Sequence, residues 1–157
     1  MATGQWIARI DDDDIWTTDH LEVLLNYAQE KKYEFVSGQY EKEEYGERKI
    51  FEGVRAADYY SYKKKAKGEG PMIGATSTWL YRSYLKFIRY NINCWRKNWN
   101  RVNDADFGNR LLKSSVRMGY VPRVLAYILP RPGEDQVGSK VYLSKPGDAE
   151  EHYRFIK

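Results

Sequence analysis

Four consecutive aspartates, residues 11–14, constrain this chain more than any other feature of its sequence. They end a short apolar segment, residues 5–10, that has the composition of a β-strand, and they precede a second apolar pair, Ile15 and Trp16. Adjacent carboxylates repel one another, so this segment needs a compensating interaction wherever it lies. The sequence therefore raises the question of what offsets four neighbouring negative charges.

The spacing of apolar residues predicts strands that alternate with helices. Strands are expected at residues 5–10, 33–44 and 120–129, with a further turn and strand at 45–53. Residues 72–82 predict a strand that runs into a helix near Ser83. Thr17 or Thr18 is expected to cap a helix that extends to about Lys31. A second helix is expected from Asn103, with one face made by Phe107, Leu111, Ser114 and Met118.

Alternation of this kind predicts the α/β class, with a mixed sheet flanked by helices. At 157 residues the chain is long enough for one domain with a core, and its composition is that of a globular protein. We expect the domain to occupy residues 1–143 and a charged tail to follow at 144–157. One cysteine, no signal peptide and no apolar run long enough to span a membrane together predict a cytoplasmic protein.

Carboxylates that follow a strand of an open α/β sheet lie at the edge where such sheets bind ligands. Oxygen ligands suit Mg²⁺ or Mn²⁺, which are often held by one or two carboxylates together with substrate phosphates. Such an ion would relieve the repulsion among the aspartates. The alternative is a solvated acidic turn, which an isolated run of aspartates favours.

Residues 4–25, GQWIARIDDDDIWTTDHLEVLL, resemble the metal-motif segment of the family 2 glycosyltransferases, which have the GT-A fold. Residues 33–40 are similar to the strand that follows this motif, and residues 74–85 to the segment that lines the acceptor site. Residues 103–129 resemble the acid-bearing helix and last strand of the family. The resemblance extends from Gly4 to about Tyr142 and indicates a truncated GT-A domain. The Gln-x-x-Arg-Trp motif of the processive relatives is absent from the sequence.

The resemblance implies metal-dependent transfer of a sugar from a nucleotide-diphosphate donor to an acceptor hydroxyl, with inversion. Asp13 matches the aspartate that contacts the metal, and Asp11 the first aspartate of the motif, near the ribose or the metal. Asp12 occupies the variable position between them, on the donor side, and Asp14 the next, often acidic, position. Mn²⁺ or Mg²⁺ is the implied cofactor. The implied partners are a nucleotide-diphospho-sugar donor and a glycan or lipid-linked acceptor.

Asp104 falls where the family places its catalytic base, which takes the proton of the acceptor hydroxyl. The spacing alone favours another interpretation, in which Asn103 caps the helix and Asp104 and Asp106 interact with the positive end of its dipole. Only the family pattern favours Asp104 as the base, and Asp106 is assigned to the cap.

Aromatic and basic residues near the acceptor and donor complete the predicted site. Trp79, Trp95 and Trp99 are candidates for stacking on the acceptor sugar, although Trp79 has an equal claim to the core. Arg131 and Lys140 lie in a segment that is either a lid whose cations reach phosphate or an ordinary surface loop.

The position of the motif departs from the family pattern, because the strand–helix units that build the nucleoside pocket normally precede it. We therefore expect an incomplete donor site and an exposed edge at residues 5–10, which would pair with a second copy or another chain. The alternative function is a non-catalytic glycan-binding or assembly module. A nucleic-acid-binding domain is a weaker alternative, because the aspartates would repel phosphate. Lipid-linked acceptors of many relatives would place the protein peripherally at the inner membrane surface.

Overall fold

The computed structural model describes residues 3–44, 46–55, 71–91, 93 and 103–129. The expected charged tail at residues 144–157 lies outside this range. The described elements, in chain order, are β1 (Trp6–Ala8), β2 (Asp14–Trp16), α1 (His20–Glu30), β3 (Phe35–Glu44), β4 (Glu47–Phe51), β5 (Val54–Arg55), β6 (Met72–Ile73), the 3-10 helix η2 (Thr76–Thr78), β7 (Leu80–Arg82), the 3-10 helix η3 (Ser83–Phe87), α2 (Asn103–Lys113) and β8 (Met118–Ile128).

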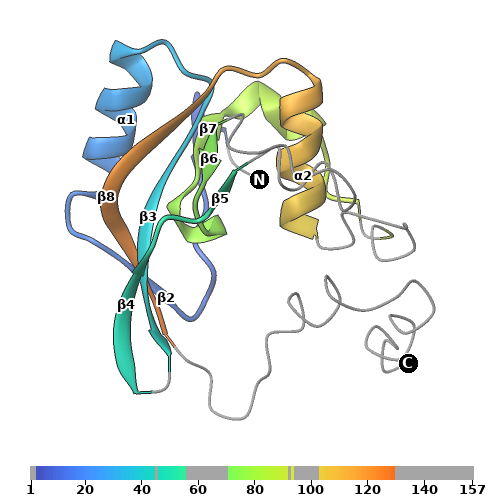
Figure 1. Cartoon of the computed structure of the whole chain (residues 1–157). Coiled ribbons are helices and arrows are strands. Elements are labelled where there is room, and N and C mark those ends of the chain that lie inside the picture. Colours follow the sequence, from blue (N-terminus) through green and yellow to red (C-terminus); the bar gives the residue numbers. More distant parts are fainter. Residues whose placement is uncertain (1–2, 45, 56–70, 92, 94–102, 130–157) are drawn as a thin grey trace.

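Six of the described strands form one mixed sheet in the order β1-β7-β3-β8-β2, with β4 paired to the far end of β3 (Figure 1). β3 and β8 run parallel, and the other described pairs in this sheet are antiparallel. The register between β3 and β8 shifts after Gly38, because Gly38 pairs with Val121 but Gln39 pairs with Val124. The skipped residues include Pro122, which has no N–H to donate to a ladder. The predicted mixed α/β fold is confirmed.

The two described α-helices cover opposite faces of the sheet (Figure 1). Because side chains alternate along a strand, Phe35 packs in the cluster that contains Phe107 and Leu111 of α2. Its neighbour Val36 packs in the other cluster, with Leu24 and Ala28 of α1. Two separate cores therefore hold the sheet between the helices. No helix in the described part of the chain is long and apolar enough to cross a membrane.

Several boundaries differ from those that the sequence predicts. The first helix begins after Asp19, which makes no side-chain capping bond, so the expected cap at Thr17 or Thr18 is wrong. The expected helix near Ser83 is only a short 3-10 helix. α2 ends at Lys113, because Ser115 takes a positive φ of 54° and the chain turns into β8. Met118 therefore begins a strand and does not continue the helical face.

β1 lies at one end of the strand order, and among the described strands it pairs with β7 alone. The expected strand at residues 5–10 is thus present in a shorter form. It is an edge strand of the described sheet. Pairing of this edge with a second copy or another chain stays a prediction.

Trp79 belongs to the core, so its predicted role in stacking on an acceptor sugar is wrong. Only 1% of its surface is exposed, and its ring stacks on Phe107 at 5.8 Å between centroids. Its indole N–H donates to the carbonyl of Gly74 at 2.9 Å. A third ring, Phe35, meets it edge-on at 5.3 Å. These contacts leave no ring face for a sugar.

The substitution Trp79→Phe tests this placement. Because it removes a buried donor and part of a close-packed ring, we expect the free energy of unfolding to fall by about 2 kcal/mol. Urea unfolding would measure the change. Trp6→Phe, at the half-buried edge of the sheet, is the control and should cost less. An unchanged stability for Trp79→Phe would contradict the core assignment.

His20 is a buried histidine between α1 and β8. Its Nδ1–H donates to the carbonyl of Leu125 at 2.8 Å, and its ring stacks on Trp16 at 4.3 Å. Its Nε2 atom is buried and has no hydrogen-bond partner among the described residues. Burial lowers the pKa of His20 below its ordinary value of 6.5, although the Leu125 carbonyl and Asp19 oppose the shift.

This lowered pKa makes stability depend on pH. Below pH 6.5 the unfolded chain binds a proton that folded His20 does not, so stability should fall from there down to the folded pKa. We expect His20→Asn, which keeps a donor for the Leu125 carbonyl but does not titrate, to lose this part of the dependence. Urea unfolding at about pH 7.5 and about pH 5 would measure it. Equal losses on acidification in both proteins would contradict the assignment.

Candidate active site

The four aspartates form a tight turn between β1 and β2. The amide of Asp14 donates to the carbonyl of Asp11 at 3.2 Å, which closes the turn. Asp12 and Asp13 therefore occupy its two central positions. Asp12 is exposed, and Asp13 is half-buried. Asp14 also begins β2, a strand that pairs with the end of β8 and that the sequence does not predict. We refer to residues 11–14 as the aspartate turn.

Two hydroxyl groups of η2 bind the ends of the aspartate turn. Thr76 donates its Oγ1 hydrogen to Asp11 Oδ2 at 2.6 Å. Ser77 Oγ accepts the amide hydrogen of Asp11 at 3.0 Å and donates its own hydrogen to Asp14 Oδ2. The residues of η2 are more than sixty positions away in the sequence. The first and last aspartates are therefore fixed by a distant segment of the chain.

The carboxylates of the turn act on one another electrostatically. Partial burial raises the pKa of Asp14, and the negative charges of Asp13 and Asp11 raise it further. The hydrogen bonds from Ser77 and from the backbone of Leu129 oppose this rise, because they favour the charged form. The repulsion that the sequence implies is thus present in the fold and is only partly offset by hydrogen bonds.

Arg9 supplies a positive charge beside the turn. Its guanidinium lies 3.4 Å from Asp11 Oδ1 and also donates to the hydroxyl of Tyr90. It sits 4.7 Å from the centre of the Tyr90 ring, which in turn stacks on Phe107 of α2 at 4.8 Å. Burial raises the pKa of Tyr90 to about 12, and the charge of Asp104 adds to the rise while Arg9 opposes it. Arg9 therefore connects the aspartate turn to α2.

A cleft of about 240 Å³ opens beside η2 and the start of α2. Its polar wall includes Thr76, which binds Asp11, and Asp104, in the first turn of α2. A side chain at Gly74 would place its Cβ only 1.9 Å from the Gly38 carbonyl oxygen, so glycine is required there. The residues that line the cleft are Tyr40, Gly53, Val54, Ile73, Gly74, Ala75, Thr76, Asp104 and Ile128.

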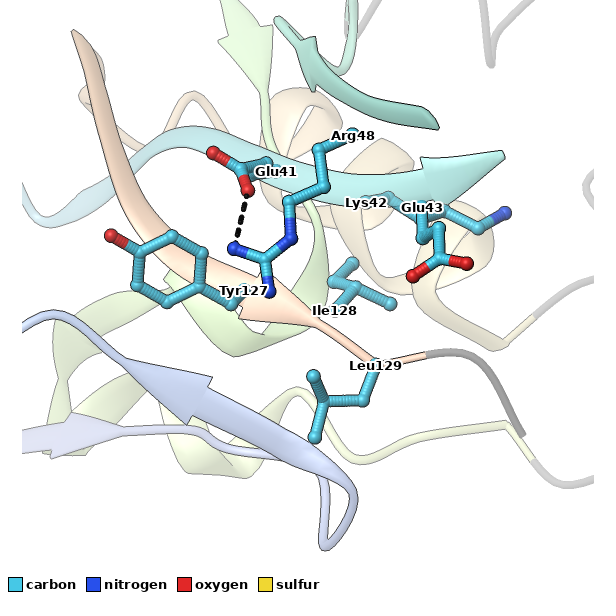
Figure 2. A pocket seen from close by; sticks show the side chains of 7 residues that line it. All are labelled: Glu41, Lys42, Glu43, Arg48, Tyr127, Ile128 and Leu129. Atoms are coloured by element: carbon cyan, nitrogen blue, oxygen red, sulfur yellow. Dashed lines mark hydrogen bonds and ion pairs between the residues drawn. The ribbon is translucent and has the colours of Figure 1, made fainter. Parts of the chain in front are cut away.

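A second hollow lies between β3, β4 and the end of β8, and Figure 2 shows its lining. Arg48 pairs with Glu41 there at 3.2 Å, over Tyr127 and Leu129. Its volume of about 20 Å³ is close to that of one water molecule. The larger cleft is therefore the better candidate for a substrate site.

The remaining predicted site residues divide into two groups. Asp106, assigned to the helix cap, is fully buried, and its carboxylate pairs with the partly exposed Arg110 at 2.9 Å from Nε. Trp95, Trp99, Arg131 and Lys140 lie outside the described residues, and their roles stay predictions.

The turn fits a metal site of the kind that the resemblance implies, in which the described side chains supply only part of the coordination. Within the described ranges, no three His, Cys, Asp or Glu side chains are arranged to hold a metal ion. Mg²⁺ and Mn²⁺ are often held by one or two carboxylates, with substrate phosphates completing the coordination. Asp11 is bonded to Thr76 and Arg9, and Asp13 lies at the centre of an oxygen-rich turn. The donor set thus suits an ion that arrives with a diphosphate.

Sequence reasoning missed Arg9, Thr76, Ser77 and Tyr90. The segment 74–78 contains three successive hydroxyl residues and lies in the part that resembles the acceptor-site segment of the family. Nothing in the sequence indicates that these hydroxyls face the aspartates, because the contacts depend on how β7 and β8 order the sheet.

The family profile described as glycosyl transferase family 2 matches residues 1–88. The matched part contains the aspartate turn and η2, whereas α2 with Asp104 lies beyond it. No curated protein sequence matches the chain. Because the profile covers more than half of the 157 residues and includes the turn held by Thr76 and Ser77, the chain belongs to glycosyl transferase family 2.

Proposed function

We propose that this domain transfers a sugar from a nucleotide-diphosphate donor to an acceptor hydroxyl, with inversion at the anomeric carbon. One observation carries the proposal: Thr76 joins the aspartate turn to the cleft that Asp104 lines, since Thr76 donates to Asp11 and itself lines the cleft. Family membership supplies the reaction class, a transferase with sugar donor and acceptor substrates.

On the donor side, Asp13 would hold Mn²⁺ or Mg²⁺, and Asp11 and Asp12 would contact the donor. When bound, the ion would neutralise charge on the leaving diphosphate. The carboxylate of Asp11 is kept in place by Thr76 and Arg9, so it can orient the donor without moving. Arg9 also lowers the negative potential that the turn would otherwise present to a phosphate.

On the acceptor side, Asp104 would accept the proton of the attacking hydroxyl. It is half-buried in the first turn of α2 and lines the cleft. The positive end of the helix dipole favours the charged form of a carboxylate, which is the form that can act as a base, and the same effect makes it a weaker base. The apolar residues Tyr40, Val54 and Ile128 line the same cleft and would contact the less polar face of an acceptor.

The metal assignment is tested with Asp13→Ala. Because the ion would be held by this carboxylate, we expect Mn²⁺-dependent binding of nucleoside diphosphates and their sugars to weaken at least about tenfold. Calorimetric titration of the full chain, with and without Mn²⁺, would measure it. Glu22→Gln, which removes an exposed carboxylate from α1, is the control. Equal affinity in the wild type and Asp13→Ala would disprove the role of Asp13.

The base assignment is tested with Asp104→Asn. We expect the variant to bind the donor with normal affinity but to transfer sugar about 10²–10⁴-fold more slowly, since only proton removal is impaired. Release of nucleoside diphosphate in the presence of a panel of acceptor glycans would measure the rate. Glu22→Gln serves again as the control, because it removes a carboxylate from the first turn of the other helix.

Binding of glycans without metal and without donor turnover would instead support a non-catalytic glycan-binding module.

A further inference from the structure

We propose that Thr76 and Ser77 are positioning residues, whose hydroxyls hold the aspartate turn in the shape that presents Asp13 to the donor diphosphate. The inference rests on the proposed function for the identity of the ligand. The contacts themselves do not depend on it.

Ser77 joins the two ends of the turn through a single oxygen atom. A hydroxyl can accept one hydrogen bond while it donates another. Ser77 Oγ does both, because it accepts the amide hydrogen of Asp11 at 3.0 Å and donates to the carboxylate of Asp14. Thr76 adds a bond of 2.6 Å to the Asp11 carboxylate. Both terminal aspartates therefore depend on η2.

The aspartate turn needs such support because its negative charges repel one another when the turn holds them close together. Its four consecutive side chains are all carboxylates, and neighbouring negative charges repel one another. Arg9 places a positive charge beside Asp11, at 3.4 Å. Hydrogen bonds to ionised acceptors are stronger than those between neutral groups. Ser77 therefore adds to the backbone bond that keeps Asp11 and Asp14 close together, and Thr76 fixes the carboxylate of Asp11.

The 3-10 helix that carries these hydroxyls is itself firmly held. Ser77 and Thr78 are fully buried. The side chain of Thr78 accepts the amide hydrogen of Gly38 at 3.2 Å and donates to the carbonyl of Ala75 at 2.7 Å. The indole N–H of Trp16 donates to the carbonyl of Ser77 at 2.7 Å. A rigid support of this kind can fix the position of groups bound to it.

The support also joins the two halves of the site. Thr76 bonds to the aspartate turn and lines the cleft with Asp104. Loss of its hydroxyl should therefore loosen the donor side without removing any group that contacts the metal. A weaker donor site after loss of this hydroxyl would therefore indicate that Thr76 positions the metal-binding carboxylate and does not bind the metal itself.

The test compares two isosteric substitutions in the same 3-10 helix. Thr76→Val removes the hydroxyl that binds Asp11, whereas Thr78→Val removes one that binds Gly38 and Ala75. Ser77→Ala and the conservative Thr76→Ser complete the set. Calorimetric titration of the full chain with Mn²⁺ and inorganic pyrophosphate would report affinity for a metal-bound diphosphate. Amide hydrogen exchange at Asp11 and Asp14 would report the turn without any ligand.

We expect Thr76→Val and Ser77→Ala to bind the probe about tenfold more weakly, the usual effect of removing a hydrogen bond to a charged group. Exchange at Asp11 and Asp14 should accelerate in Ser77→Ala. Thr78→Val should lower thermal stability but keep the affinity, and Thr76→Ser should restore it. A general structural effect would instead weaken binding in proportion to lost stability, in Thr78→Val as well, and would overturn the inference.

The remaining outcomes separate this inference from the proposed function. If Asp13→Ala abolishes binding while Thr76→Val and Ser77→Ala retain it, the proposed function stands and the positioning role is wrong. If the wild type does not bind the probe, the metal site of the proposed function fails. Hydrogen exchange then decides the inference: faster exchange in Ser77→Ala supports it, and unchanged exchange overturns it.

Discussion

The repulsion among four adjacent carboxylates is the constraint on which the candidate site depends. Contacts to both ends of the aspartate turn partly offset this repulsion. Thr76 and Arg9 bind Asp11, and Ser77 binds Asp14. These contacts leave Asp12 and Asp13 at the centre of the turn. Burial and the neighbouring charges still raise the pKa of Asp14, so the compensation is incomplete. A turn of this kind favours a cation, which would remove the remaining repulsion.

The contacts to the turn exist because the core places η2 beside it. Trp79, directly after η2, is buried between Phe35 and Phe107, and its indole bonds to Gly74. Gly74 in turn lies so close to the Gly38 carbonyl that no side chain fits between them. The same packing brings α2 and Asp104 to the cleft. The core of the domain and the geometry of its site therefore have a common origin in the contacts of β3 with the segment from Gly74 to Trp79.

Particular residues show which parts of the fold can be predicted from the sequence alone. Leu24 and Ala28 recur at helical spacing, and α1 is where they predict it. Phe35 and Val36 lie in the strand predicted at residues 33–44 and begin β3, where their side chains point to opposite faces. β2 is missed, because three residues that include Asp14 carry no strand pattern and form a strand only by pairing with β8. Trp79 is ambiguous in the sequence, since an indole suits both a sugar site and a core, and only packing decides between them.

The sequence by itself determined the α/β class, the aspartate cluster after the first strand and the acidic start of the second helix, because periodicity and charge are local properties. It also carried the resemblance to the family that the profile over residues 1–88 confirms. Only the tertiary structure decided that Thr76 and Ser77 bind the aspartates, that Arg9 connects the turn to Tyr90, and that Asp104 shares a cleft with Thr76. These contacts join residues far apart in the chain. Their geometry follows from strand order and core packing, and local sequence patterns predict neither of these.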